Sequence, residues 1–512
     1  MKTPNRLMRD LLTGLTCILF AGCATVDPKR DYSAVTQHVI EATGQSSTYR
    51  PDQEDAVESR VEALLAGGLT ADEAVQVCLL NNPGFQAAWM DVGMAKADLV
   101  QSGLLSNPSL GGSLRLPAGG GLANLEVTMA QNIADLWRIP VKQRSAQASL
   151  DQAILLLARK ASDLAADTRA AYFRAVGAQE VHSVAQENLA IAKQLLELAL
   201  GRQRAGAGAE LDVNLSRSAV LEAELAVEST RLAASETRRS LAKLLGLSTD
   251  PERLTLSDSL PESSPVTSEA EKLIERARQA RLDVRAAEQA VFQAKARVQE
   301  EWLKVFPVVE LGVAMERAER QKQPGRDILA DTARASIANG ALAAPEIQPR
   351  SQRRQNADFI IGPSWGLELP IFDQNQAQIA KARYSYEQAS KTLESVDRMM
   401  TQEVRSAVDQ MVTTWKIVGL YRESFVPLAQ SSLSLSRESY KAGRASFLSV
   451  LESQRFYLDT RRRSIEAVQS AVATIPELER VVGTPIGELQ SADAGHPATQ
   501  PATSRPTTGD RP

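Results

Sequence analysis

Few side chains in this 512-residue sequence have types and spacings that could do chemistry. The three histidines, His38, His182 and His496, are too scattered to share a metal ion. The sequence also has no glycine-rich phosphate-binding loop, no clustered metal ligands and no nucleophile placed beside a base. We therefore expect no enzymatic activity, no cofactor and no bound metal.

The thiol of Cys23 is the exception, because it stands at the end of an export signal. A basic region over residues 2–9 precedes a short apolar run over residues 11–20. The following Phe20-Ala21-Gly22-Cys23 resembles a lipobox, with Phe20 in place of the usual Leu, and this implies that Cys23 is acylated. Ala24, rather than Asp, resembles the signal that sorts lipoproteins to the outer membrane. An ordinary secretory signal cleaved nearby is the alternative.

The remaining cysteines predict no disulfide. Cys17 leaves with the signal, and with Cys23 acylated only Cys78 keeps a free thiol. We expect Cys78 to pack between helices. After the signal, no stretch has about 18 consecutive apolar residues, so we expect no transmembrane helix. The net charge of −4 gives a nucleic-acid partner no electrostatic support.

The chain makes one turn twice, 237 residues apart, first at Ala205-Gly206-Ala207-Gly208-Ala209-Glu210-Leu211-Asp212-Val213 and again at Ala442-Gly443-Arg444-Ala445-Ser446-Phe447-Leu448-Ser449-Val450. In both copies the Ala-Gly ends a long helical pattern, because Gly adopts the left-handed conformation after a helix at little cost. A second helical pattern follows. Each turn therefore predicts a helical hairpin.

Further matches indicate an internal duplication. Gly246 matches Gly483 at the same separation, whereas Pro108 matches Pro307 at a separation of only 199. An insertion of about 39 residues in the second copy, within residues 315–358, explains the difference. The insertion admits two interpretations, a solvated lid or a ligand site.

Both copies predict the same order of elements, namely a helix, a β-hairpin and a long helical hairpin. Alternating apolar and polar residues at 109–133 and 308–371 predict the hairpins. Between residues 136 and 204, apolar side chains fall on one seven-residue seam, which predicts a helix about 100 Å long. The sequence thus predicts a mainly α protein with a small β part.

The expected organisation has six parts along the chain. They are a signal peptide (1–22), a lipidated extended N-terminal segment (23–66), a first repeat (67–249) with β-hairpin 109–133, a linker (250–267), a second repeat (268–485) with β-hairpin 308–371 and insertion 315–358, and a disordered tail (486–512).

Four strands are too few to close a barrel, and two exposed hairpins would leave backbone groups unpaired in lipid. Three copies would supply twelve strands, enough for a closed β-barrel with an open centre, and the helical hairpins would continue it as a trimeric α-barrel. Three of the five tryptophans, Trp137, Trp302 and Trp365, lie in or beside the strand regions. An interfacial aromatic belt explains their place, and packing at helix–strand junctions explains it equally well.

Over roughly residues 66–485 this layout resembles the TolC-type outer-membrane efflux factor family, in particular its lipoprotein branch in tripartite export systems. The resemblance rests on four motifs, which are Leu69-Thr70-x-x-Glu73-Ala74 with Asn82-Pro83, Leu105-x-Asn107-Pro108-x-Leu110, Leu369-Pro370-Ile371-Phe372-Asp373, and the Ala-Gly-x-x-Ser-x-Leu-x-Val turn. It implies a homotrimeric channel-tunnel in the outer membrane lipid that exports small molecules or ions from the periplasm. A periplasmic adaptor and an inner-membrane pump are its implied partners.

In that family the hairpin turns form the periplasmic entrance and meet the adaptor. The positions that match here are Gly206, Gly208, Asp212, Gly443, Ser446, Ser449 and Glu452. The resemblance also implies that acids after the turn narrow the entrance and repel anions. Ser449 replaces the first acid of the second-copy pattern and Glu452 keeps the second, while Asp212 occupies the matching first-copy position. A solvated charge at a helix start, favoured by the helix dipole, is the alternative explanation for both acids.

Two other functions stay open at this point. A periplasmic coiled-coil adaptor or scaffold lipoprotein would need no strands, so the alternating stretches argue against it. The outer-membrane duct of a type I protein secretion system shares the fold and differs in its pump. The sequence does not indicate the cargo.

Overall fold

The computed structural model describes residues 24–116, 123–248, 254–261, 269–319, 326–342 and 357–485. The expected signal peptide, Cys23 and the tail, together with parts of the linker and of the insertion, lie outside the described residues. The chain divides into two compact units. A helical unit draws on residues 1–98, 147–292 and 387–512, and a strand-bearing unit draws on residues 99–146 and 293–386.

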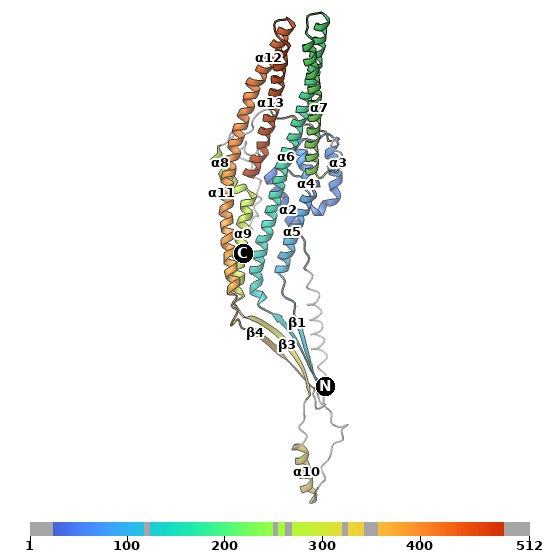
Figure 1. Ribbon diagram of the computed structural model, residues 1–512. Coiled ribbons are helices and arrows are strands. Elements are labelled where there is room, and N and C mark those ends of the chain that lie inside the picture. The colour runs from blue at the N-terminus through green and yellow to red at the C-terminus, as the bar shows by residue number, and fades with distance from the viewer. Residues whose placement is uncertain are drawn as a thin grey trace, which may run out of the picture. The chain divides into compact units, whose positions relative to one another are not determined.

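Long helices dominate the helical unit (Figure 1). The first hairpin consists of α6 (Asp135–Arg204), most of which lies in this unit, and α7 (Glu210–Leu244). The second consists of α11 (Gln376–Leu420), a π-helical segment η4 (Tyr421–Phe425) and α12 (Val426–Lys441), which return through α13 (Phe447–Val482). The expected long helical hairpins are confirmed. Within the described part of the chain, none of the helices has an apolar stretch of membrane-spanning length.

The predicted seam of α6 is its buried face. Leu150, Leu157, Ala161, Thr168 and Ala175 lie on it and are all buried. Small residues such as Ala let neighbouring helices approach closely, which suits a protein with only 4% aromatic residues. The core is therefore a set of helix–helix seams rather than one cluster of large side chains.

The expectation of an extended segment over residues 23–66 is wrong. The structure has helix α2 (Lys29–Thr43), a 3₁₀ turn η1 (Pro51–Ala56) and helix α3 (Val57–Leu65). Tyr32, Val35, Val39 and Ala42 recur at helical spacing and are buried. Only four of the fifteen residues of α2 carry this apolar pattern, and the other residues are mostly polar. The overall composition of the segment therefore indicated an extended chain.

Each repeat opens with a helix that breaks against the end of its own hairpin. In the first repeat, α4 (Ala71–Asn81) and α5 (Pro83–Ser102) meet where a Cβ on Gly246 would lie 2.5 Å from the Asn81 carbonyl oxygen. In the second, α8 (Ala270–Ala280) and α9 (Leu282–Leu303) meet at Arg281, and a Cβ on Gly483 would lie 3.1 Å from its Cα. The paired glycines therefore permit the same close approach twice.

The strand-bearing unit contains one antiparallel sheet in the order β1-β2-β3-β4. Its strands are β1 (Ser109–Arg115), β2 (Asn124–Asn132), β3 (Val308–Glu319) and β4 (Ala357–Glu368). Helix α10 (Arg326–Asn339) lies in the insertion, where the strands extend further than the boundaries 315–358 suggest. The two expected hairpins thus pair with each other through β2 and β3, and the expected fold class, mainly α with a small β part, is confirmed.

Candidate functional site

Backbone hydrogen bonds around Gly206 close the first turn. The Ala207 N–H donates to the Arg202 carbonyl and the Gly206 N–H to the Gln203 carbonyl, both at 2.9 Å. Gly206 has φ +70°, the left-handed conformation that favours glycine. Gly208 serves another purpose, because a Cβ at that position would lie 2.9 Å from the backbone nitrogen of Gln203. Both glycines are therefore needed for the tight path between α6 and α7.

The second turn repeats this geometry and adds a side-chain cap. Gly443 has φ +71°, and the Arg444 N–H donates to the Ser439 carbonyl at 2.8 Å. Ser446 caps α13, since its hydroxyl accepts from the Ser449 N–H at 3.3 Å. The Ser449 hydroxyl in turn donates to the Ser446 carbonyl at 2.7 Å. Ser449, at the position where the resemblance implies an acid, thus forms part of the helix cap.

A polar contact joins the two turns. The Arg202 guanidinium donates to the Tyr440 carbonyl at 2.6 Å, and its carbon lies 4.5 Å from the centre of the Tyr440 ring. The Tyr440 hydroxyl donates to Asp212 at 3.4 Å. Burial, followed by the negative charge of Asp212, raises the pKa of Tyr440, so the phenol keeps the proton it donates. Asp212 is therefore half-buried and engaged rather than freely solvated.

An apolar cluster packs next to this contact. Tyr440, Phe447, Val450, Leu451 and Leu195 are all buried and come from α6, α12 and α13. The rings of Tyr440 and Phe447 meet edge to face, with their centres 5.4 Å apart. The tips of the two hairpins therefore form one packed structure.

The remaining predicted positions lie on the surface. Gly206, Gly443, Ser446 and Glu452 are exposed, and Glu452 makes no hydrogen bond or ion pair within the described residues. Gly206 and Gly443 are thus exposed at the two tips, and Gly208 is half-buried.

Sequence reasoning missed Arg202 and Tyr440. The duplication could not reveal them, because the positions 237 residues away hold Ser439 and Gln203. Only the juxtaposition of the two tips shows that they act together.

The β-sheet has one apolar and one polar face. Successive side chains along each strand point to opposite faces of the sheet. The register places most apolar residues opposite apolar ones and most polar residues opposite polar ones. The apolar face carries Leu110, Leu114, Leu125, Val127, Met129, Leu311, Val313, Met315, Ile361, Trp365 and Leu367, with the polar Gln131 and Arg317 near its ends. Leu110 and Trp365 are each 77% exposed. A contiguous face of exposed apolar side chains like this one indicates contact with lipid or with protein rather than with water alone.

The polar face is acidic. Glu126, Glu310, Glu316 and Glu368 lie on it, and Glu126 and Glu316 stand directly opposite each other across β2 and β3. Arg115 lies 3.6 Å from Glu126. Val308 and Ile360 are large apolar residues on this face.

The three tryptophans of the strand-bearing unit are partly or largely exposed. Trp137 is 37% and Trp302 47% exposed, and the Arg383 guanidinium lies 5.6 Å from the Trp302 ring centre. An aromatic belt at the membrane interface stays a prediction.

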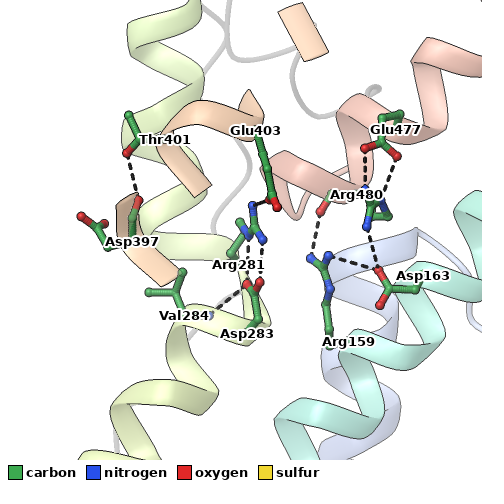
Figure 2. Close-up of polar contacts among 10 residues, drawn as sticks. All are labelled: Arg159, Asp163, Arg281, Asp283, Val284, Asp397, Thr401, Glu403, Glu477 and Arg480. Carbon is green, nitrogen blue, oxygen red and sulfur yellow. Dashed lines mark hydrogen bonds and ion pairs between the residues drawn. The ribbon is translucent and has the colours of Figure 1, made fainter. Parts of the chain in front are cut away.

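Figure 2 shows a charged network in the helical unit, near the helix break at Arg281. Arg281 is buried, and its guanidinium donates to Glu403 at 2.6 Å and to Asp283 at 2.9 Å. Burial works against the charge on Asp283, but hydrogen bonds from Arg281 and the charges of Arg159 and Arg281 lower its pKa below the usual value. The helix break is therefore held by a buried guanidinium between two partly exposed carboxylates.

A second part of the network joins α6 to α13. Arg159 donates to the Arg480 carbonyl at 3.0 Å and pairs with Asp163 at 3.1 Å. Arg480 forms an ion pair with Glu477 at 2.5 Å. These contacts connect the first repeat to the end of the second (Figure 2).

Cys78 has the packing role expected of it. Its thiol is buried and donates to the Leu244 carbonyl at 3.2 Å, and burial raises its pKa to about 11. The thiol is therefore protonated and unreactive at neutral pH. In the described ranges, no group of His, Cys, Asp or Glu side chains is arranged to hold a metal ion.

Comparison with known proteins matches this architecture. A model of the outer membrane efflux protein family matches residues 74–247 and again residues 273–484. Protein CyaE of Bordetella pertussis is 26% identical over 254 residues, which cover 47% of this chain and 53% of CyaE. The cobalt-zinc-cadmium resistance protein CzcC of Cupriavidus metallidurans is 22% identical over 424 residues, covering 82% of this chain and 91% of CzcC. The alignment with CyaE thus spans about half the length of that relative.

Solved structures share the fold. The outer membrane protein VceC of Vibrio cholerae superimposes with a TM-score of 0.62 at 16% identity, over 81% of this chain and 96% of VceC. Because one family model accounts for both repeats and for most of the chain, this protein belongs to the outer membrane efflux protein family.

Proposed function

We propose that three copies of this chain form a channel in the outer membrane that carries small molecules or ions from the periplasm to the exterior. Cys23 would anchor each copy in the lipid, and a periplasmic adaptor and an inner-membrane pump would deliver the cargo. The observation that carries the proposal is the division of the sheet into an exposed apolar face and an acidic polar face. The proposed role involves no catalytic step.

The open edges of the sheet support assembly. Within the described residues, β1 and β4 each pair with one neighbour only. Unpaired backbone groups are costly in lipid, so a membrane-spanning sheet must close on itself. Pairing β1 of one copy with β4 of the next, three times over, gives a barrel of twelve strands that turns its apolar face to lipid and its acids to the lumen.

Exposed apolar side chains on the helices support the same assembly. On one hairpin they are Leu211, Leu221, Leu225 and Leu232, and on the other Val412, Leu420, Leu428 and Leu435. Two different surfaces that fit each other generate a closed ring when copies associate head to tail. A second copy is therefore the partner that we assign to both stripes.

The turns would form the periplasmic entrance. Gly206, Gly208, Gly443 and Ser446 would meet the adaptor, because they shape or cap the exposed tips. Asp212, Glu452 and Ser449 would lie around the opening. The acids there, with those on the polar face of the sheet, favour cations over anions.

Conductance across a planar bilayer tests this function. Full-length protein extracted in detergent should form stable, cation-preferring channels. The double variant Asp212→Asn/Glu452→Gln should lower the cation preference, measured as a shift of the reversal potential in a salt gradient. The matched variant Glu224→Gln/Glu236→Gln removes two charges from α7 further from the tip and should leave the reversal potential unchanged. Folded protein that never conducts would contradict a channel, and an unchanged potential in Asp212→Asn/Glu452→Gln would remove these acids from the entrance.

A further inference from the structure

A cavity of about 520 Å³ lies between α6 and α7 within the helical unit. The residues that matter for its chemistry are Gln179 and His182 on α6 and Arg231, Arg238 and Arg239 on α7. Among the described residues that line it, none has a carboxylate. None of its lining residues belongs to the turns or to the sheet, and Leu232 at its edge belongs to the apolar stripe assigned above to contact between copies.

The positive charge in this cavity is incompletely neutralised. Arg231 pairs with Glu228 at 2.9 Å. Arg238 donates from one terminal nitrogen to the uncharged Gln179 at 3.0 Å, and its buried Nε has no acceptor. Arg239 has no hydrogen-bond or ion-pair partner within the described residues. In the part of the chain that the structure describes, the guanidinium groups of Arg238 and Arg239 thus have no acidic partner.

Both ring nitrogens of His182 are already hydrogen-bonded to protein groups, so the imidazole is not available to a bound molecule. One ring nitrogen lies 3.1 Å from the Thr230 hydroxyl and the other 3.0 Å from the Gln186 amide nitrogen. The Thr230 hydroxyl donates to the Ala226 carbonyl at 2.8 Å, so it accepts from the ring. With both nitrogens engaged, the imidazole forms a wall of the cavity.

The second repeat shows that the hairpin does not need these arginines. The positions 237 residues beyond Arg231, Arg238 and Arg239 hold Val468, Ile475 and Pro476, none of which carries a charge. Helix α13 nevertheless packs in its hairpin as α7 does. Arginine at these three positions is therefore not required for a hairpin of this kind to pack.

We propose that this cavity binds a multiply charged oxyanion, of the phosphate type, through Arg238 and Arg239. A guanidinium presents a planar fork of donors that matches two oxygens of such a group, and two adjacent forks favour a dianion over chloride. The oxyanion is either free phosphate or the phosphate of a lipid headgroup, because both present the same oxygens.

Isothermal titration of full-length, detergent-solubilised protein with sodium phosphate tests the site, with sodium chloride at equal ionic strength as the reference. Saturable phosphate binding is expected in the wild type. Arg238→Gln/Arg239→Gln should weaken it at least tenfold. Arg455→Gln/Arg463→Gln removes two exposed arginine charges from α13 and should bind as the wild type does. Circular dichroism identifies any variant that fails to fold, and in that case Arg239→Gln alone, at an exposed residue, replaces the double variant.

Dihexanoyl-phosphatidic acid, a soluble lipid, separates the two sources. Binding at least tenfold tighter than inorganic phosphate indicates a lipid headgroup, and equal or weaker binding indicates free phosphate. Equal phosphate affinity in the wild type and in Arg238→Gln/Arg239→Gln, or no binding above the chloride reference, would overturn the site. Neither result bears on conductance, so the channel function stands or falls separately.

Discussion

At the scale of single residues, Arg281 shows how a charge is kept inside this protein. Its side chain is 4% exposed and has two acids as partners, Asp283 and Glu403. A buried ion pair adds little net stability when intact, but removal of one partner leaves an uncompensated charge that costs about 3–5 kcal/mol. The network is therefore a point of vulnerability at the break between α8 and α9.

The lowered pKa of Asp283 makes this contribution depend on pH. Its charge stabilises the folded state fully above the unfolded pKa of about 4. The contribution is lost as the pH falls through the lower folded pKa. We expect Asp283→Asn to melt at a lower temperature than wild type at pH 7 and the two to converge below about pH 3.

Thermal unfolding in detergent, followed by circular dichroism, measures this difference. Asp409→Asn is the control, because Asp409 is an exposed acid on α11 with no ion pair among the described residues, and it should match the wild type at both pH values. A constant difference between Asp283→Asn and wild type from pH 7 to pH 3 would show that the carboxylate charge is irrelevant.

Single residues were predictable where local sequence determines their role. Thr70 and Glu73, three residues apart, form a capping box, and Cys78 packs between helices as expected. The pairing of Tyr440 with Asp212 and of Arg281 with Glu403 was not predictable, because the partners lie 228 and 122 residues apart and neither Tyr440 nor Arg281 recurs in the other repeat. Long-range polar contacts leave no periodic signal in a sequence.

At the scale of elements, the two glycine turns determine the shape of the tips. Gly206 and Gly443 both have positive φ, and a Cβ at either position would meet no atom within 4 Å. A side chain there costs backbone strain of about 1–3 kcal/mol without a steric clash. The strain should therefore loosen the turn and leave the rest of each helix intact.

We expect Gly206→Val/Gly443→Val to speed amide hydrogen exchange around both turns and to impair export, with oligomer size unchanged. Hydrogen–deuterium exchange and gel filtration measure the two physical effects. Gly201→Ala, at an exposed helical position with room for a Cβ, should exchange no faster than the wild type. Normal export by the valine variant, despite looser tips, would argue against adaptor contact at the turns.

Elements with a strong period were predicted well, and those with a weak one were not. The seam of α6 and the alternation of the strands predicted both types of element. Helix α2 was missed because the polar composition of its segment outweighed four well-spaced apolar residues. The pairing of β2 with β3 was also missed, since alternation determines the faces of a strand but not its neighbour.

At the scale of the whole molecule, the apolar face of the sheet explains why one copy is insufficient. Four strands with open edges and exposed leucines cannot be stable in water or in lipid alone. The internal duplication doubles the strands within one chain, and association of three chains would supply the rest. The number of strands, which the sequence predicts, therefore leads to the assembly that a single chain does not display.

Electron cryomicroscopy of the full-length protein, extracted from the outer membrane in mild detergent, tests this central claim most directly. The account predicts particles of three copies in which β1 of each copy pairs with β4 of the next, with Leu110 and Trp365 facing the detergent and Glu126 and Glu316 facing a lumen. Particles of one copy, or a closed sheet with these acids on the detergent side, would contradict it.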